Sequence, residues 1–180
     1  MKSIKNLFTG VLLATLLVSC SQKETLQGYF VNHQDSPNFM SIDIPTGVLG
    51  IDKTKLTEEQ KLAYESINKL NMLGYSLKDG NETEFQQELS KVRTILKDTK
   101  YQDLIRGGNN SDGKVVVKYI GSDSSIDELI VLGSMNDKGF AVVRVLGDDM
   151  QPAKIMKLSE AIKDINLAEQ DISSFVEFFK

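Results

Sequence analysis

Three short segments in the second half of the chain constrain its fold more than any other feature. Residues 114–120 (KVVVKYI), 128–134 (ELIVLGS) and 140–147 (FAVVRVLG) are rich in β-branched residues, which favour strands. Turn sequences with glycine and aspartate separate them, and the link at 135–139 (MNDKG) is short enough for a hairpin. The pattern predicts three strands, of which the last two are antiparallel neighbours.

A helix with one apolar face is predicted between residues 83 and 96, where Thr83 and Gln86 are placed to cap its first turn. Its apolar residues recur at spacings of four, three and four, which is typical of a stripe that faces a core. They are Phe85, Leu89, Val92 and Leu96.

Three more helices are predicted by the same periodicity. A short one begins at Leu26. Another begins at Thr57, which resembles a capping box with Gln60, and the last begins at Pro152, because proline suits a first helical turn. The apolar residues on their buried faces are Leu26, Tyr29 and Phe30; Leu56, Ala63, Ile67 and Leu70; and Ile155, Leu158, Ile162 and Ile165.

Two further strands are predicted in the first half of the chain. Residues 38–45 alternate between two faces and stop at Pro45, and residues 72–77 form a short apolar run. Strands that are grouped together, with helices elsewhere in the chain, indicate an α+β fold. We expect a single domain over residues 26–165, with a largely antiparallel sheet and helices packed mainly on one face.

Residues 1–19 have the layout of a lipoprotein signal peptide. Lys2 and Lys5 precede an apolar run that is too short for a membrane-spanning helix of about 20 residues. The sequence LVSC that ends at Cys20 resembles a bacterial lipobox, in which the cysteine is lipidated and becomes the mature N-terminus. We therefore expect residues 20–25 to be a lipidated N-terminus and tether. The alternative is a buried or free thiol.

The composition narrows the class of protein. Cys20 is the only cysteine, so no intramolecular disulfide can form and stability must come from an ordinary core. The net charge of −4 favours solubility. It also argues against a nucleic-acid partner, which would call for a clustered basic face.

Several segments together resemble a known family. They are the lipobox start, YFVNHQDSPNFMSIDIP at 29–45, IDELIVLGSMNDKGFAVVRVLGDD at 126–149 and MQPAKIMKL at 150–158. Their pattern and order, over about residues 26–165, are similar to domain-of-unknown-function family 4252, which consists of small lipoproteins from Bacteroidota. The resemblance implies a location outside the cytoplasm, in a Gram-negative envelope. It implies no activity.

The residues after Cys20 bear on the location. Ser21 is not aspartate, so the familiar retention signal of enteric inner-membrane lipoproteins is missing. Lys23 and Glu24 resemble the short lysine-then-acid tags that send some Bacteroidota lipoproteins to the cell surface, although any polar tether would look similar. We expect a protein anchored by lipid in the outer membrane, on either its periplasmic face or the cell surface.

The sequence holds no complete catalytic or metal-binding motif. Residues 108–114 match the first seven positions of a phosphate-binding loop, but Val115 replaces the serine or threonine that holds magnesium. A polar hairpin or loop is the better interpretation. His33 is the only histidine, and without an available cysteine it cannot build a usual zinc site. We expect no cofactor and no metal.

Two acidic pairs remain as catalytic candidates. Glu58 and Glu59 fall in the first turn of a predicted helix, where the helix dipole stabilises negative charge. Asp148 and Asp149 lie between the last predicted strand and the helix that follows, which either of them can cap. Structural roles are expected. The alternative is a hydrolase that uses paired carboxylates on envelope or extracellular polysaccharide.

The C-terminal residues 166–180 are predicted to form an amphipathic helix. Its apolar face consists of Ile172, Phe175, Val176 and Phe179. This face either folds against the domain or binds a partner. Because no catalytic motif is present, we expect a non-catalytic binding or scaffold module with an unidentified protein or glycan partner.

Replacing the predicted lipidation site tests the anchor. Because a multiply acylated cysteine would hold the protein in the membrane almost permanently, Cys20→Ala should abolish fatty-acid labelling and membrane fractionation. Both are measured by growth with labelled palmitate followed by separation of membranes. Labelling that persists in the variant would contradict the lipobox interpretation.

Overall fold

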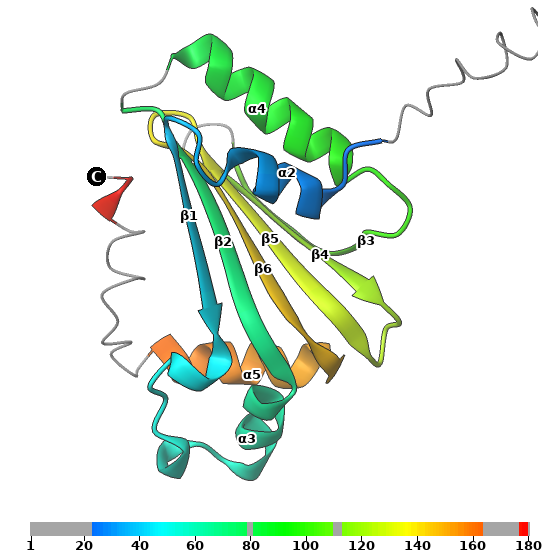
Figure 1. Ribbon diagram of the computed structural model, residues 1–180. Helices are drawn as coiled ribbons and strands as arrows, with labels where there is room; N and C mark the ends of the chain where they lie inside the picture. The colour runs from blue at the N-terminus through cyan, green and yellow to red at the C-terminus, as the bar shows by residue number, and fades with distance from the viewer. Residues whose placement is uncertain (1–22, 79–80, 110–112, 164–176, 180) are drawn as a thin grey trace, which may run out of the picture.

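A six-stranded antiparallel sheet with the order β1-β2-β6-β5-β4-β3 forms the centre of the protein (Figure 1). The computed structural model describes residues 23–78, 81–109, 113–163 and 177–179. The strands are β1 (Phe39–Pro45), β2 (Ile67–Ser76), β3 (Gln102–Asn109), β4 (Gly113–Gly121), β5 (Ile126–Met135) and β6 (Gly139–Met150). Strand β6, the last of these in the sequence, therefore lies inside the sheet and pairs with both β2 and β5.

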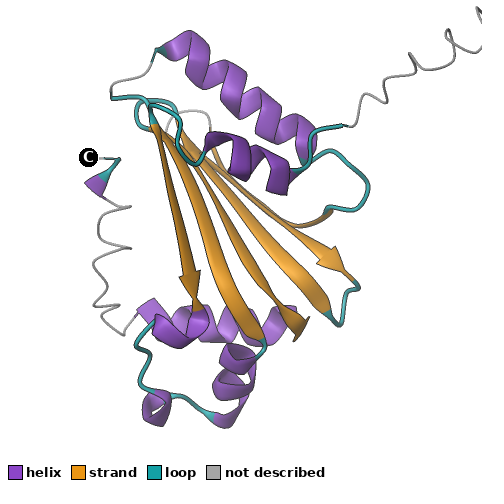
Figure 2. Ribbon diagram, in the orientation of Figure 1, coloured by secondary structure: helices purple, strands orange, loops and turns teal. Residues whose placement is uncertain are grey.

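Helices pack on both faces of the sheet and near opposite ends of the strands (Figure 2). Helices α2 (Leu26–His33) and α4 (Glu82–Ile95) cover one face, called here the first face. Helices α3 (Glu58–Glu65) and α5 (Pro152–Lys163) pack at one end of the second face, beside the short turns η2 (Thr46–Val48) and η3 (Lys53–Lys55). Among the described residues, no helix is long and apolar enough to cross a membrane.

Two cores form because successive strand residues point to opposite faces of a sheet. The first core, beneath α2 and α4, includes Tyr29, Leu73, Tyr75, Phe85 and Phe140. The second core, against α3 and α5, includes Met72, Ile126, Met150, Ile155 and Leu158.

The predicted α+β single-domain fold with an antiparallel sheet is confirmed. The helices cover both faces of the sheet and not mainly one, because both faces carry apolar strand residues that must be buried. The three β-rich segments of the second half lie in β4, β5 and β6, and the last two strands are antiparallel neighbours as predicted. Gly108 and Asn109 of β3 pair with Lys114 and Gly113 of β4. The hairpin interpretation of that segment is therefore correct.

The helix predicted from Thr57 to Leu70 is wrong beyond Glu65. Thr57 and Gln60 form the expected capping box, in which Gln60 N donates to Thr57 Oγ1 over 3.3 Å and Thr57 N donates to Gln60 Oε1 over 2.9 Å. The chain then enters β2 at Ile67. Leu70 pairs with residues of both β1 and β6, so pairing on two sides overrides the helical spacing.

The sequence pattern also misses strand β3 and misplaces the cap of α4. Strand β3 has one β-branched residue, Ile105, and it pairs only with β4 at the edge of the sheet. Helix α4 is capped by Asn81, not by Thr83, because Asn81 Oδ1 accepts a hydrogen bond from Glu84 N over 2.6 Å.

The apolar stripe of α4 is buried as predicted, which makes it suitable for a stability test. Leu89→Ala should lower the free energy of unfolding by about 2–5 kcal/mol, because it leaves a cavity in the first core. Gln87→Ala, on the exposed side of the same helix, should lower it by less than about 0.5 kcal/mol. Chemical denaturation of both variants measures the difference, and equal losses would contradict the packing of α4.

Candidate functional site

A groove lies between the C-terminal end of α4 and strands β3 and β4. Its volume is about 520 Å³, which is within the range of small-molecule sites. Its apolar lining includes Leu96, Tyr101, Val116 and Leu132. Its charged residues, which define what we call the basic groove, are Arg93, Lys97, Asp98, Asp103, Arg106, Lys114 and Lys118.

Positive charge predominates in the basic groove, although the chain has a net charge of −4. Five cationic side chains accompany two carboxylates, an excess of three positive charges. Strand alternation places Lys114 and Lys118 on the same face of β4. Arg93 and Lys97 come from the last turn of α4 and the turn after it. The groove is thus built from segments that only the fold brings together.

Lys118 is the buried cation of the groove and is 8% exposed. Its ammonium group donates to the Tyr101 carbonyl over 2.9 Å and forms an ion pair of 2.9 Å with Asp103 Oδ1. An ammonium group has three N–H donors, so one donor remains after these two contacts.

Asp103 is shared between two cations. Arg106 Nη2 donates to both of its carboxylate oxygens, over 2.9 and 2.8 Å, and Lys118 contacts the first of them. The hydrogen bond from Arg106, and then that from Lys118, lower the pKa of Asp103 below its ordinary value. Asp103 therefore stays ionised, but one carboxylate cannot neutralise both cations.

The other cations of the basic groove have no hydrogen-bond or ion-pair partner within the part of the chain that the structure describes. They are Arg93, Lys97 and Lys114, and all three are exposed. Arg93 lies in the last turn of α4, where a cation stabilises the helix dipole without using its side-chain donors. Together with the spare donor of Lys118, these groups can bind an anion.

A second groove, of about 1170 Å³, runs along the outer side of α4 and is called here the tether groove. Lys23, Glu24 and Thr25 line one part of it. It shares Lys97, Asp98 and Tyr101 with the basic groove, so the two grooves adjoin at the end of α4.

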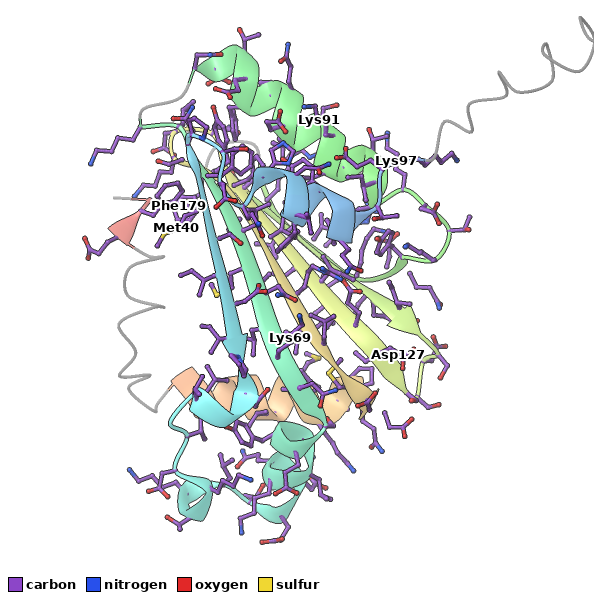
Figure 3. All side chains as sticks on the ribbon, viewed as in Figure 1. Met40, Lys69, Lys91, Lys97, Asp127 and Phe179 are labelled. Carbon is purple, nitrogen blue, oxygen red and sulfur yellow. The ribbon has the colours of Figure 1, made fainter. Side chains whose placement is uncertain are left out.

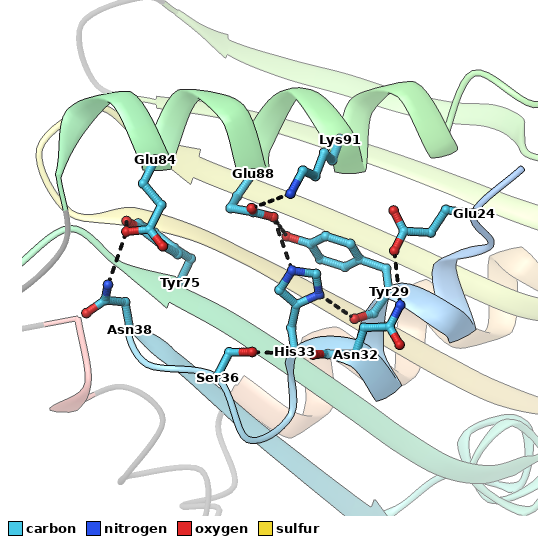
Figure 4. Close-up of polar contacts among 10 residues, drawn as sticks. All are labelled: Glu24, Tyr29, Asn32, His33, Ser36, Asn38, Tyr75, Glu84, Glu88 and Lys91. Atoms are coloured by element: carbon cyan, nitrogen blue, oxygen red, sulfur yellow. Dashed lines mark hydrogen bonds and ion pairs between the residues drawn. The ribbon is translucent and has the colours of Figure 1, made fainter.

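A buried polar cluster holds α2 against α4 (Figure 4). Its centre is Glu88, which is 8% exposed. The Tyr29 hydroxyl donates to Glu88 Oε2 over 2.9 Å, His33 Nε2 lies 3.3 Å from the same oxygen, and Lys91 Nζ donates to Oε1 over 2.6 Å. His33 Nδ1 lies 2.8 Å from the Tyr29 carbonyl oxygen. The only histidine is thus committed to a contact between helices.

A second carboxylate of α4 ties the helix to the sheet. Glu84 Oε2 accepts hydrogen bonds from the Tyr75 hydroxyl over 3.1 Å and from Asn38 Nδ2 over 3.2 Å (Figure 4). A carboxylate removed from water is stable only when its oxygens are paired. The buried Glu88 and the half-buried Glu84 therefore fix the position of α4 over the first core.

Most of the site residues predicted from the sequence lie outside the described residues: Cys20, Ile172, Phe175 and Val176. Phe179 is half-buried and packs against the second core, near Met40 of β1 (Figure 3). Glu24 Oε1 accepts a hydrogen bond from Asn32 Nδ2 over 3.4 Å, and Lys23 is exposed.

The residues of the two acidic pairs make structural contacts. Glu58 and Glu59 lie in the first turn of α3 as predicted, and Glu59 Oε2 accepts a hydrogen bond from Lys157 of α5 over 2.7 Å. Asp148 and Asp149 belong to the end of β6 and not to the link after it. Their carboxylates accept hydrogen bonds from neighbouring asparagine and serine side chains, each over 2.8 Å.

The model of one protein family matches residues 29–158, which include the whole sheet and more than half of the chain. The chain belongs to the DUF4252 family. DUF4252 is described as a domain of unknown function, so the predicted family is confirmed and no activity comes with it. The comparison with curated proteins and that with solved structures found no match. Both the basic groove and the Glu88 cluster lie within the matched DUF4252 range.

The hydrogen bonds from Tyr29 to Glu88 and from Tyr75 to Glu84 make the protein lose stability at alkaline pH. Burial, and then the negative charge of Glu88, raise the pKa of Tyr29 above its ordinary value of about 10. Burial and the hydrogen bond to Glu84 raise the pKa of Tyr75 to about 12. A folded-state pKa above the unfolded value contributes stability that is fully present below about pH 10 and is lost as the pH rises further.

We therefore expect the free energy of unfolding to fall between about pH 10 and 11.5 in the wild type and to fall less steeply in Tyr29→Phe. The difference in slope should approach about 1.4 kcal/mol per pH unit, the value for one titrating group. Urea denaturation at a series of pH values measures it. Parallel slopes in the two proteins would show that the Tyr29 hydroxyl is not held by Glu88 as described.

Proposed function

We propose that this DUF4252 protein is a lipid-anchored envelope protein that acts as a non-catalytic binding module, and that its basic groove binds an anionic ligand. The observation that carries the proposal is the set of unpaired cations, Arg93, Lys97 and Lys114, around the buried Lys118. Hydrogen bonds between ionised partners are about twice as strong as neutral ones. The apolar lining favours a ligand that has an apolar part beside its anionic group.

The pairing of three carboxylates, Glu88, Asp103 and Glu128, favours binding over the alternative of hydrolysis. Glu88 has three partners, Asp103 has two cations, and Glu128 Oε1 accepts a hydrogen bond from Arg144 Nε over 2.6 Å. A hydrolase that uses two carboxylates needs one of them as a free acid with a raised pKa, opposite the other across the substrate. Carboxylates held by cations are poorly suited to that role.

The proposed anchor is a lipid on Cys20, in the outer membrane. Residues 21–25 span at most about 17 Å when extended, so the domain would stay close to the bilayer. Lys23 and Glu24 then lie in the tether, and the contact of Glu24 with Asn32 gives this residue a structural role besides a possible export signal. The periplasmic face and the cell surface both remain compatible with this tether.

Anion binding is tested by isothermal titration calorimetry at low salt, with inorganic pyrophosphate and citrate as probes. The wild type should bind, and the affinity should fall as added salt screens the charges. Lys97→Glu/Lys114→Glu reverses two charges of the groove and should weaken binding at least about tenfold, since a charge-assisted contact is worth about 1.5–3 kcal/mol.

The matched control is Lys53→Glu/Lys55→Glu, which makes the same change in net charge on η3, away from the groove. It should retain the wild-type affinity. Equal weakening in the two double variants would show an effect of net charge alone, and a wild type that binds neither probe would refute the groove as an anion site.

A further inference from the structure

The tether enters the domain next to the basic groove. The chain reaches α2 beside the end of α4, where α4 turns toward β3 (Figure 1). Lys97, which lines both the tether groove and the basic groove, lies at this end of the helix (Figure 3). A membrane that holds the lipid anchor at the start of the tether therefore lies close to the basic groove.

Exposed lysines continue from the basic groove toward the tether, among carboxylates that include Glu24 and Asp98. Lys23 and Lys100 line the tether groove, and both are exposed. Lys100 Nζ lies 4.9 Å from the centre of the Tyr101 ring, which keeps this ammonium group beside the lining that the two grooves share. On η3, by contrast, Lys53 and Lys55 are each within ion-pair distance of a carboxylate.

We propose that the basic groove binds phosphate groups of lipid headgroups in the membrane that carries the protein's own anchor, so that the end of α4 rests on the bilayer. The proposal rests on the proposed function, because it uses the same groove and the same anchor. Cys20 precedes Lys23 by three residues, which span at most about 10 Å. Headgroup phosphates around the anchor then lie close to the tether groove, whose lining includes Lys97.

Because the anchor already holds the protein at the membrane, a weak affinity of the groove for a headgroup is sufficient to orient the domain. Tethering turns headgroup binding into an intramolecular step with an effective concentration in the millimolar range. Each lysine or arginine close to an anionic surface adds a preference of about fivefold, so the three unpaired cations give on the order of a hundredfold. The lipid thus determines that the protein stays at the membrane, and the groove determines which side of the domain faces it.

Orientation is measured with single tryptophan residues, because the chain contains none. Thr99→Trp places a reporter at the rim of the basic groove. Leu62→Trp places one on α3, at a position that is 57% exposed and lies at the other end of the molecule. The full-length lipidated proteins are inserted in vesicles of phosphatidylcholine, with or without phosphatidylglycerol, that contain brominated lipids as contact quenchers.

In anionic vesicles the Thr99→Trp fluorescence should be quenched at least about threefold more than the Leu62→Trp fluorescence. The difference should shrink in pure phosphatidylcholine, at high salt and when Lys97→Glu/Lys114→Glu is added. Addition of Lys53→Glu/Lys55→Glu should leave it unchanged. Calorimetry with pyrophosphate first checks that the Thr99→Trp protein still binds the soluble probe.

Two outcomes would overturn the proposal, and they are distinguishable. If pyrophosphate binds but the two reporters are quenched equally in anionic vesicles, the groove takes a soluble anion and the membrane is not its ligand. The proposed function then stands without the headgroup contact. If pyrophosphate does not bind and quenching is equal, the anion-binding groove itself fails.

Discussion

The burial of one face of α4 against the sheet is the interaction on which the rest of the structure depends. Phe85, Leu89 and Val92 complete the first core, and the oxygens of Glu88 receive the side chains that α2 presents. The position of α4 then sets two other features. Its C-terminal end lies opposite β4 and forms one wall of the basic groove. Its contacts with α2 determine where the tether leaves the domain.

Local sequence patterns predict the helices and strands whose structure depends mainly on residues close together in the sequence. The stripe of α4 follows from periodicity, and the strands β4, β5 and β6 follow from their β-branched residues and the turns between them. The capping box at Thr57 follows from two side chains. Prediction fails where pairing with a strand that is distant in the sequence determines the structure of a segment. Ile67 and Leu70 have helical spacing, yet β2 pairs on both sides and becomes a strand. Strand β3 has little intrinsic preference and depends on β4 for its existence.

The basic groove is less predictable than the fold, for a related reason. Its cations come from α4 and from two strands, and the net charge of the chain conceals their concentration in one place. One signal was present: Lys114 and Lys118 are an even number of residues apart in a predicted strand and so share a face. What the sequence lacks is the register of β3, which brings Arg106 and Asp103 to the same place.

The position of β6 has a consequence for the order in which the sheet can form. Without β6, the segments before it can form only two separate pieces of sheet, β1 with β2 and β3 with β4 and β5, each with an unpaired edge toward the gap. A polypeptide that emerges N-terminus first from a ribosome therefore lacks the strand that joins these pieces until most of its length has been made. Such long-range pairing delays folding. The topology itself therefore delays completion of the sheet until the last strand has been released.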